Sequence, residues 1–192
     1  TSNAHDISEL QSLVESNRVD GMLLTRALED DRALQYLSQA NFPTALTGTC
    51  RYDNIIQVDT DNEGAAEKMT TLLIGKGFRR FAFLVKDMSY NVDRKRHEGF
   101  CRALIKNGIS EKDQLFYNGS IRMEFLDAII ENIISKKVEC IICGDDEICT
   151  MVMSRLQAEG YRIPKDVAIA SLYNSTNLDC YSPAVTAVSV AA

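Results

Sequence analysis

Apolar segments of two kinds alternate along this chain, and their alternation constrains the fold more than any other feature of the sequence. Short continuous apolar runs, typical of buried strands, are followed by longer stretches in which apolar residues recur at helical spacing. Strands that alternate with helices form parallel sheets joined by right-handed crossovers. The sequence therefore predicts an α/β fold built on parallel sheet.

The individual elements follow from the same two patterns. The predicted strands are 19–25, 43–47, 55–58, 80–85, 115–117, 140–143, 167–172 and 185–190. The predicted helices carry apolar residues over 7–17, 33–40, 65–73, 100–104, 126–133 and 148–156. Asp30 and Asp31 are candidate N-caps for the second helix, and Gly77, Gly108 and Gly160 are positioned to end later ones.

Charge and hydropathy exclude two classes of partner. The net charge is -6 and the isoelectric point is about 5.0, whereas nucleic-acid affinity comes mainly from neutralised phosphates. No window of about twenty apolar residues is present, so no membrane partner is predicted. Residues 1–4 are typical of an expression scar. Because the chain starts on a helix and ends on a strand, we expect a fragment of a longer protein.

Six cysteines in a domain of this size indicate reduced thiols and a cytoplasmic protein rather than a disulfide framework. Cys140 and Cys143 form a C-x-x-C pair, a spacing found in zinc and redox sites. The alternative is a buried strand over 138–143, in which positions i and i+3 point to opposite faces. We favour the strand, since no second C-x-x-C occurs, and predict no metal.

An enzyme is not indicated. The sequence contains no Gly-rich phosphate loop, no G-x-S-x-G and no H-E-x-x-H. His97 and Cys101 are spaced to pair on a helix, but a cysteine within an apolar helical stripe is usually a core residue. We therefore predict neither catalysis nor a cofactor.

One joint between a helix and a strand is distinctive. Residues 160–172 read G-Y-R-I-P-K-D-V-A-I-A-S-L, and 182–188 read S-P-A-V-T-A-V. A helix-ending glycine leads to a proline, a buried strand and then a second strand that follows a proline. This order resembles the signature of the effector-binding domain of LacI-type bacterial transcription regulators.

Further segments, in the same order as in that family, extend the resemblance over most of the chain. They are V-D-G-M-L-L at 19–24, T-D-N-E-G-A at 60–65, G-F-R-R-F-A at 77–82, R-H-E-G-F at 96–100 and C-G-D-D at 143–146.

The resemblance implies a periplasmic-binding-protein-like fold of type I, with two similar lobes and a ligand cleft between them. It places an incomplete N-terminal lobe at 5–86, a C-terminal lobe at 87–188 and the end of a returning strand at 189–192. It further implies a homodimer that senses a sugar or sugar derivative and binds operator DNA through a domain absent from this chain. The alternative is a solute-binding receptor of an ABC-type sugar transporter, which has the same two-lobed fold.

Candidate ligand contacts follow the carboxyl ends of strands, where open α/β sheets bind ligands. Arg96 matches the family's ligand-clamping arginine, and its planar fork of donors suits that role. Asp145 can accept hydrogen bonds from ligand hydroxyls, with Asp146 as the expected helix N-cap. The full set of candidate ligand-binding residues is Arg96, Asp145, Asp61, Asn62, Tyr173, Asn174 and Tyr90.

Two features suggest the charge of the effector. Sugar- and purine-sensing relatives carry an acidic ligand contact after the strand 167–172, whereas this chain has Tyr173 and Asn174 there. The segment Asp93-Arg94-Lys95-Arg96 is also predicted to bring three cations into the first turn of a helix, where they oppose the helix dipole. A bound anion would compensate them, so we expect an anionic effector, such as a sugar phosphate or a sugar acid.

Overall fold

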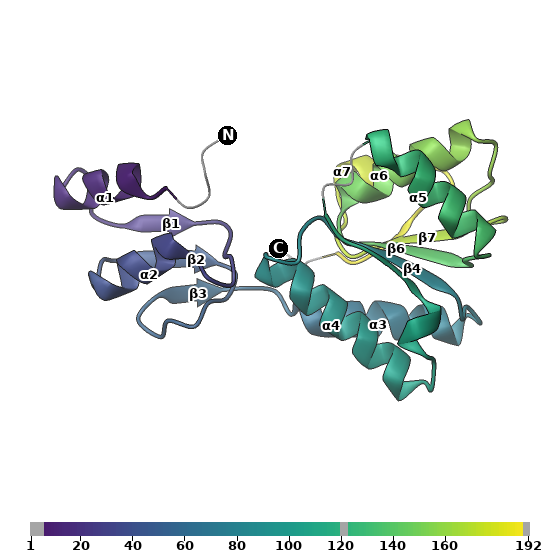
Figure 1. Cartoon of the computed structure of the whole chain (residues 1–192), viewed down its shortest axis with the longest axis horizontal. Helices are drawn as coiled ribbons and strands as arrows, with labels where there is room; N and C mark the ends of the chain where they lie inside the picture. Colours follow the sequence, from purple (N-terminus) through teal and green to yellow (C-terminus); the bar gives the residue numbers. More distant parts are fainter. Residues whose placement is uncertain (1–5, 120–122, 190–192) are drawn as a thin grey trace. The chain divides into compact units, whose positions relative to one another are not determined.

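The computed structural model describes residues 6–119 and 123–189 (Figure 1). The expected expression scar at 1–4 and the end of the predicted last strand, from residue 190 on, lie outside the described residues. The chain divides into two compact units, of which unit 1 comprises Thr1–Thr60 with Ser89–Val92 and unit 2 comprises Asp61–Met88 with Asp93–Ala192.

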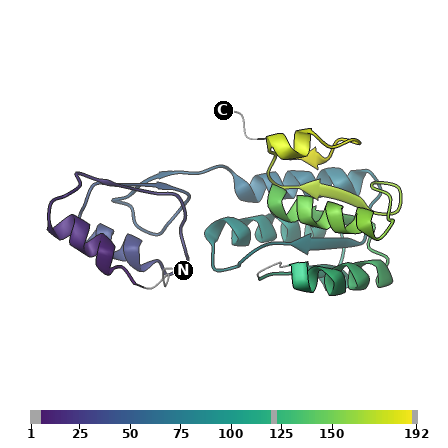
Figure 2. The same ribbon diagram turned by 90° about the horizontal axis from the view of Figure 1, so that it is seen from above.

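Unit 1 is a three-stranded parallel sheet in the order β1-β2-β3. Its elements are α1 (Ser8–Glu15), β1 (Met22–Leu24), α2 (Arg32–Gln39), β2 (Thr44–Thr47) and β3 (Ile56–Val58). Figures 1 and 2 show α1 and α2 on the same side of this sheet. Leu34 of α2 packs there with Leu46 and Ile55, and Asp31 caps α2 by accepting from the Ala33 and Leu34 N–H groups.

Unit 2 is a five-stranded, entirely parallel sheet in the order β5-β4-β6-β7-β8. The strands are β4 (Phe81–Leu84), β5 (Leu115–Tyr117), β6 (Cys140–Cys143), β7 (Ala168–Ser171) and β8 (Thr186–Ala187). The helices are α3 (Asn62–Gly75), α4 (Asn91–Lys106), η1 (Glu111–Asp113), α5 (Met123–Ser135), α6 (Asp146–Ala158) and α7 (Thr176–Asp179).

Helices cover both faces of this sheet (Figure 1). Alternate strand residues such as Phe81 and Phe83 pack with α3 and α4, while Ala82 and Leu84 pack with α5 and α6. The strands are therefore buried on both faces, which explains why they are continuous apolar runs in the sequence.

The expected lobe boundary near residue 87 requires correction. Helix α3 and strand β4 belong to unit 2, and the chain passes from unit 1 to unit 2 at Thr60–Asp61. The physical reason is that β4 pairs with both β5 and β6, so it lies inside the larger sheet. Uniform alternation of strands and helices cannot show to which sheet a strand belongs.

The helices of the structure differ from the predicted ones in two respects. The predicted strands and helices are present in the described residues, but α4 begins at Asn91, well before the apolar stripe at 100–104. Its first turns are polar and carry no helical apolar pattern. The short elements η1 and α7 were not predicted, because three or four residues are too few to show a period.

The interpretation of the C-x-x-C pair as a buried strand is confirmed. Cys140 and Cys143 are fully buried in β6, and they pack into the clusters on opposite faces of the sheet. Burial raises the pKa of the Cys140 thiol to about 12. All six cysteines are free.

One face of the unit 1 sheet is apolar and exposed. Leu23, Ile56 and Val58 are each at least 66% exposed, and Leu23 and Ile56 flank Ala45 in the strand register. Their side chains alternate with the buried residues that face α2. Exposed apolar patches favour association.

We therefore predict that this chain self-associates in a concentration-dependent way, and that Ile56→Lys with Val58→Lys weakens the association. Sedimentation velocity at several protein concentrations measures it. Ile105→Lys is the matched control, since Ile105 is an equally exposed residue (68%) on α4 of unit 2. Equal association of the wild type and the double variant would contradict the prediction.

A second prediction concerns the close packing of α3 on α4. A Cβ at Gly99 would lie 2.1 Å from the Glu63 backbone oxygen and 3.0 Å from Ala66 Cβ. We expect Gly99→Ala to destabilise unit 2 by about 1–3 kcal/mol or more, as overpacking does. Gly75→Ala is the control, because nothing lies within 4 Å of a Cβ there. Urea unfolding should show it unchanged or stabilised by up to about 1 kcal/mol.

Candidate functional site

The strand order of unit 2 identifies one edge of its sheet as the candidate site. From β4 the chain runs through α4 to β5 on one side and later returns through α5 to β6 on the other side. Helices α4 and α6, which follow β4 and β6, cover opposite faces of the sheet (Figure 1). Such a switch point leaves a crevice beyond the carboxyl ends of the two strands, where α/β sheets bind ligands.

Arg96 of α4 links three elements at this edge. Its Nε donates to Asn62 Oδ1 at 3.1 Å, and its Nη1 donates to the Gly144 carbonyl at 2.7 Å. Asn62, the first residue of α3, is buried, and Gly144 directly follows β6. The structure thus brings together two predicted site residues, Arg96 and Asn62, beside the turn that holds Asp145.

The expectation that Asp146 is the N-cap of α6 is wrong. Asp145 is the N-cap of α6 and accepts from the Ile148 N–H at 2.9 Å, while Asp146 is the first helical residue. Asp145 keeps its side chain at the switch point, but one of its oxygens is committed to the helix. Asp61 similarly caps α3 by accepting from Gly64 N–H at 2.8 Å, so its neighbour Asn62 is the one available to Arg96.

Lys86 is a further candidate residue at this edge, and the sequence analysis missed it. It follows β4, and its Nζ lies 2.9 Å from Asp145 Oδ2 and 2.5 Å from Glu147 Oε2. Burial alone would lower the pKa of Lys86, but hydrogen bonds to Glu147 and Asp145 outweigh it and raise that pKa. The sequence did hold one indication of Lys86, because it closely follows the buried strand β4. This strand pairs with β6, which precedes Asp145.

Asp93 is a buried carboxyl group at the same edge. Its Oδ2 accepts from the Asp87 N–H at 3.0 Å, which closes the loop between β4 and α4. Desolvation raises the pKa of Asp93, and the nearby charge of Asp145 adds to this. The Asp87 N–H and the Arg96 charge act in the opposite direction but do not cancel the rise.

The other predicted contacts lie at two places. Tyr173 and Asn174 follow β7 at the same edge of the sheet, where Tyr173 is 45% exposed and Asn174 Nδ2 donates to Asp179. Tyr90 belongs to unit 1, where it bridges to Leu28 and lies under the Arg26 guanidinium. The structure groups five predicted residues with Arg96 in unit 2 and leaves Tyr90 in unit 1.

The predicted run of three cations in a first helical turn is not present. Because α4 begins at Asn91, its first turn contains Asp93, and Arg94, Lys95 and Arg96 come later. An acidic residue in the first turn is favourable to the helix dipole. The charge argument for an anionic effector therefore loses its main premise.

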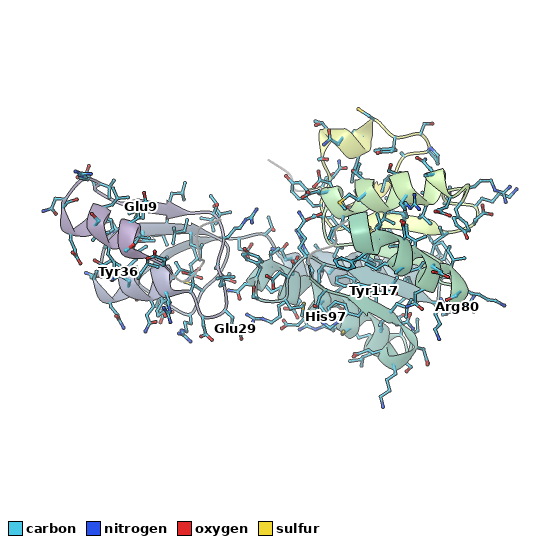
Figure 3. The ribbon with its side chains drawn as sticks, turned by 45° about the horizontal axis from the view of Figure 1, so that its top comes forward. Glu9, Glu29, Tyr36, Arg80, His97 and Tyr117 are labelled. Carbon is cyan, nitrogen blue, oxygen red and sulfur yellow. The ribbon has the colours of Figure 1, made fainter. Side chains whose placement is uncertain are left out.

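The His97–Cys101 pair is a packing contact and lacks the features of an activated nucleophile. Burial, followed by the charge of Glu111, raises the pKa of the Cys101 thiol to about 11, and burial lowers the pKa of His97. His97 of α4 (Figure 3) packs on Phe116 with ring centroids 4.2 Å apart. Among residues 6–119 and 123–189, no three His, Cys, Asp or Glu side chains gather as a metal would require.

Comparison with known proteins identifies the family of the chain. The profile of the periplasmic binding protein-like domain matches residues 70–192. The chain belongs to the periplasmic binding protein-like domain family. The resemblance to LacI-type regulators is confirmed, and the fold is theirs.

Two similar proteins are transcription regulators. Catabolite control protein A of Staphylococcus xylosus is 25% identical over 174 residues, which cover 90% of this chain and 53% of that protein. The HTH-type transcriptional regulator CelR of Thermobifida fusca is 26% identical over 184 residues, covering 93% and 54%. The chain thus spans little more than half the length of these relatives.

Solved structures extend the likeness. A LacI transcriptional regulator from Bacillus cereus subsp. cytotoxis NVH 391-98 superposes with a TM-score of 0.86 at 31% identity, covering 94% of this chain and 66% of that one. A complex of the transcriptional regulator CelR with cellobiose gives a TM-score of 0.82 at 26% identity, covering 95% and 57%. These similar proteins are transcription regulators and not enzymes.

The raised pKa of Asp93 generates a pH prediction. An acid whose folded pKa lies above its unfolded value keeps its proton longer in the native state, so its contribution to stability falls as pH rises through the folded pKa. We expect the unfolding free energy of the wild type, relative to Asp93→Asn, to decrease as the pH rises above about 3.9, the ordinary pKa of an aspartate.

Urea titrations at each pH measure this difference in unfolding free energy. Asp113→Asn, an exposed substitution in η1 of the same unit, controls for loss of a surface charge. A difference between wild type and Asp93→Asn that increases with pH would show that the buried carboxyl group has the opposite shift.

Proposed function

We propose that this chain is the effector-sensing part of a transcription regulator and that unit 2 binds a sugar at the β4–β6 switch point. The observation that carries the proposal is the convergence there of Arg96, Asn62 and the Gly144–Asp145 turn from three separate elements. Hydroxyl groups both donate and accept hydrogen bonds, and this edge offers guanidinium and ammonium donors beside carboxylate acceptors. The similarity to CelR, for which a cellobiose complex is known, supports a sugar as the ligand.

We favour an uncharged sugar over the anionic effector expected from the sequence. Two cationic side chains, Lys86 and Arg96, lie at this edge. The carboxyl groups beside them belong to Asp93, Asp145 and Glu147. An anion would therefore add negative charge where carboxylates already balance the cations. A sugar phosphate or sugar acid remains the second candidate, since Tyr173 replaces the acidic contact of the family.

The remaining parts of the proposal concern the parent protein. The similar proteins are regulators of nearly twice this length, so we propose that operator DNA is bound by a segment outside this sequence. With a net charge of -6, this chain is by itself poorly suited to bind the phosphates of DNA. We further propose a homodimer, since two-fold operators suit two-fold proteins, acting in the cytoplasm.

The role proposed is binding and not catalysis. The transporter receptor is the weaker alternative, because the similar proteins are transcription regulators and all six cysteines are free thiols. In residues 6–119 and 123–189, no helix has the length and apolar character needed to cross a bilayer.

The test is a thermal-shift panel of uncharged sugars, nucleosides, sugar phosphates and sugar acids on the wild type and Arg96→Ala. At about 100 times Kd a ligand adds about 2.7 kcal/mol to the unfolding free energy. We expect uncharged sugars to raise the melting temperature of the wild type and to have little effect on Arg96→Ala.

Arg96→Lys provides a second variant if the alanine substitution impairs folding, and Arg102→Ala on the same helix is the control, since Arg102 pairs with surface glutamates of α3. Stabilisation by nucleosides alone, or by no compound, would overturn sugar sensing. Stabilisation by sugar phosphates or acids alone would overturn the uncharged ligand and retain the site.

A further inference from the structure

We propose that Lys86 and Glu147 together bind a vicinal diol of the effector and so determine which sugars are accepted. This inference rests on the proposed function. It assigns a chemical task to two residues that the sequence analysis did not select, and it narrows the ligand to sugars that present two adjacent free hydroxyl groups.

The position of the pair is set by the topology of the sheet. Lys86 follows β4 and Glu147 lies in the first turn of α6, which follows β6. Strands β4 and β6 are hydrogen-bonded neighbours whose following helices cover opposite faces. The Lys86 ammonium therefore lies across the switch point, where a ligand in this class of sheet contacts the protein.

Lys86, Asp145 and Glu147 differ in how far their side chains are accessible to a ligand. Asp145 is 23% exposed, and its two oxygens accept from Ile148 N–H and from Lys86. Lys86 is 45% exposed and Glu147 is 69% exposed. Asp145 is therefore the anchor that orients Lys86 and caps α6, while Lys86 and Glu147 are the accessible donor and acceptor.

The chemistry of the pair matches two neighbouring hydroxyl groups. An ammonium group has three N–H donors, and the contacts to Asp145 and Glu147 use two of them. A carboxylate accepts at about four positions, so Glu147 retains acceptor capacity. One hydroxyl can then accept from Lys86 while its neighbour donates to Glu147, and charge-assisted hydrogen bonds of this kind are the strong ones.

The arrangement is also prepared before the ligand arrives. Asp145 and Glu147 fix the end of a flexible lysine side chain, which reduces the ordering that binding requires. Exposed ion pairs contribute little to folding, so substitutions here test binding with little effect on stability. Arg96 contacts Gly144, the residue before Asp145. Lys86 and Arg96 therefore both lie against the turn that follows β6.

The experiment is calorimetric titration of D-glucose, cellobiose, 2-deoxyglucose, 3-deoxyglucose and glucose 6-phosphate into the wild type, Lys86→Met and Glu147→Gln. We expect Lys86→Met to weaken binding of the sugar that the wild type prefers by about 10- to 100-fold, the loss expected for a charge-assisted hydrogen bond. Lys165→Met is the matched control, since Lys165 is exposed and precedes β7 at the opposite edge of the sheet.

The deoxy sugars identify the hydroxyl that is bound. Removing one hydroxyl of the diol should weaken binding to the wild type and cause no further loss in Lys86→Met, because coupled partners are not additive. Equal affinity of the wild type and Lys86→Met for the preferred sugar, with binding lost in Arg96→Ala, would overturn the diol pair and leave the proposed function intact.

The remaining outcomes are also decisive. If the wild type binds none of the five compounds and the wider panel fails too, the proposed function falls and this inference falls with it. If glucose 6-phosphate binds most tightly and this preference depends on Lys86, the lysine is a phosphate ligand and the diol pair is overturned.

Discussion

The turn after β6 must fit closely against the end of β4, and this fit connects the sheet of unit 2 to its site. The Gly144 N–H donates to the Leu84 carbonyl at 2.7 Å. A Cβ at position 144 would lie 3.0 Å from Val85 Cγ1 and 3.1 Å from the Leu84 oxygen. The free carbonyl of Gly144 then accepts from Arg96. The residue that completes the central strand pair therefore also receives the guanidinium that organises the edge.

A second close approach supports the same edge from the helical side. Because Gly99 has no side chain, α4 can lie against the backbone of α3 at Glu63. On α4 that contact lies about one turn after Arg96, and on α3 Glu63 directly follows Asn62, the residue to which Arg96 is hydrogen-bonded. Ion pairs from Arg102 and Lys106 to Glu63 and Glu67 continue the contact along the surface. The site is thus built on packed helices and strand ends, which hold side chains more rigidly than free loops do.

The charges at this edge are distributed by burial. Asp93 lies inside, where desolvation raises its pKa, while Lys86 and Glu147 face solvent and pair with each other. This edge of the sheet therefore carries both a buried carboxyl group and an exposed ion pair. The exposed apolar face of unit 1 is a separate surface, formed by alternate residues of β1 and β3.

Much of the fold was determined by the sequence itself. Periods of two kinds placed the strands at 115–117 and 140–143 with the bounds that the structure has, and glycines at the expected positions follow α3 and α6 with positive φ. Arg96, Asn62 and Asp145 were selected from residue type and resemblance, and the structure brings them together. Local patterns suffice for these because strand burial, helix ends and residue chemistry are properties of short segments.

Only the tertiary structure decided the rest. Sequence alternation could not show that β4 lies between β5 and β6, so it could not place the boundary at Thr60–Asp61 or reveal a switch point. It could not decide between Asp145 and Asp146 as the cap, because adjacent residues of one type are equivalent until the first turn is built. Lys86 was missed because its partners are distant in the sequence. Its partners lie 59 and 61 positions away in sequence (from 86 to 145 and 147), and strand pairing brings them within 3 Å.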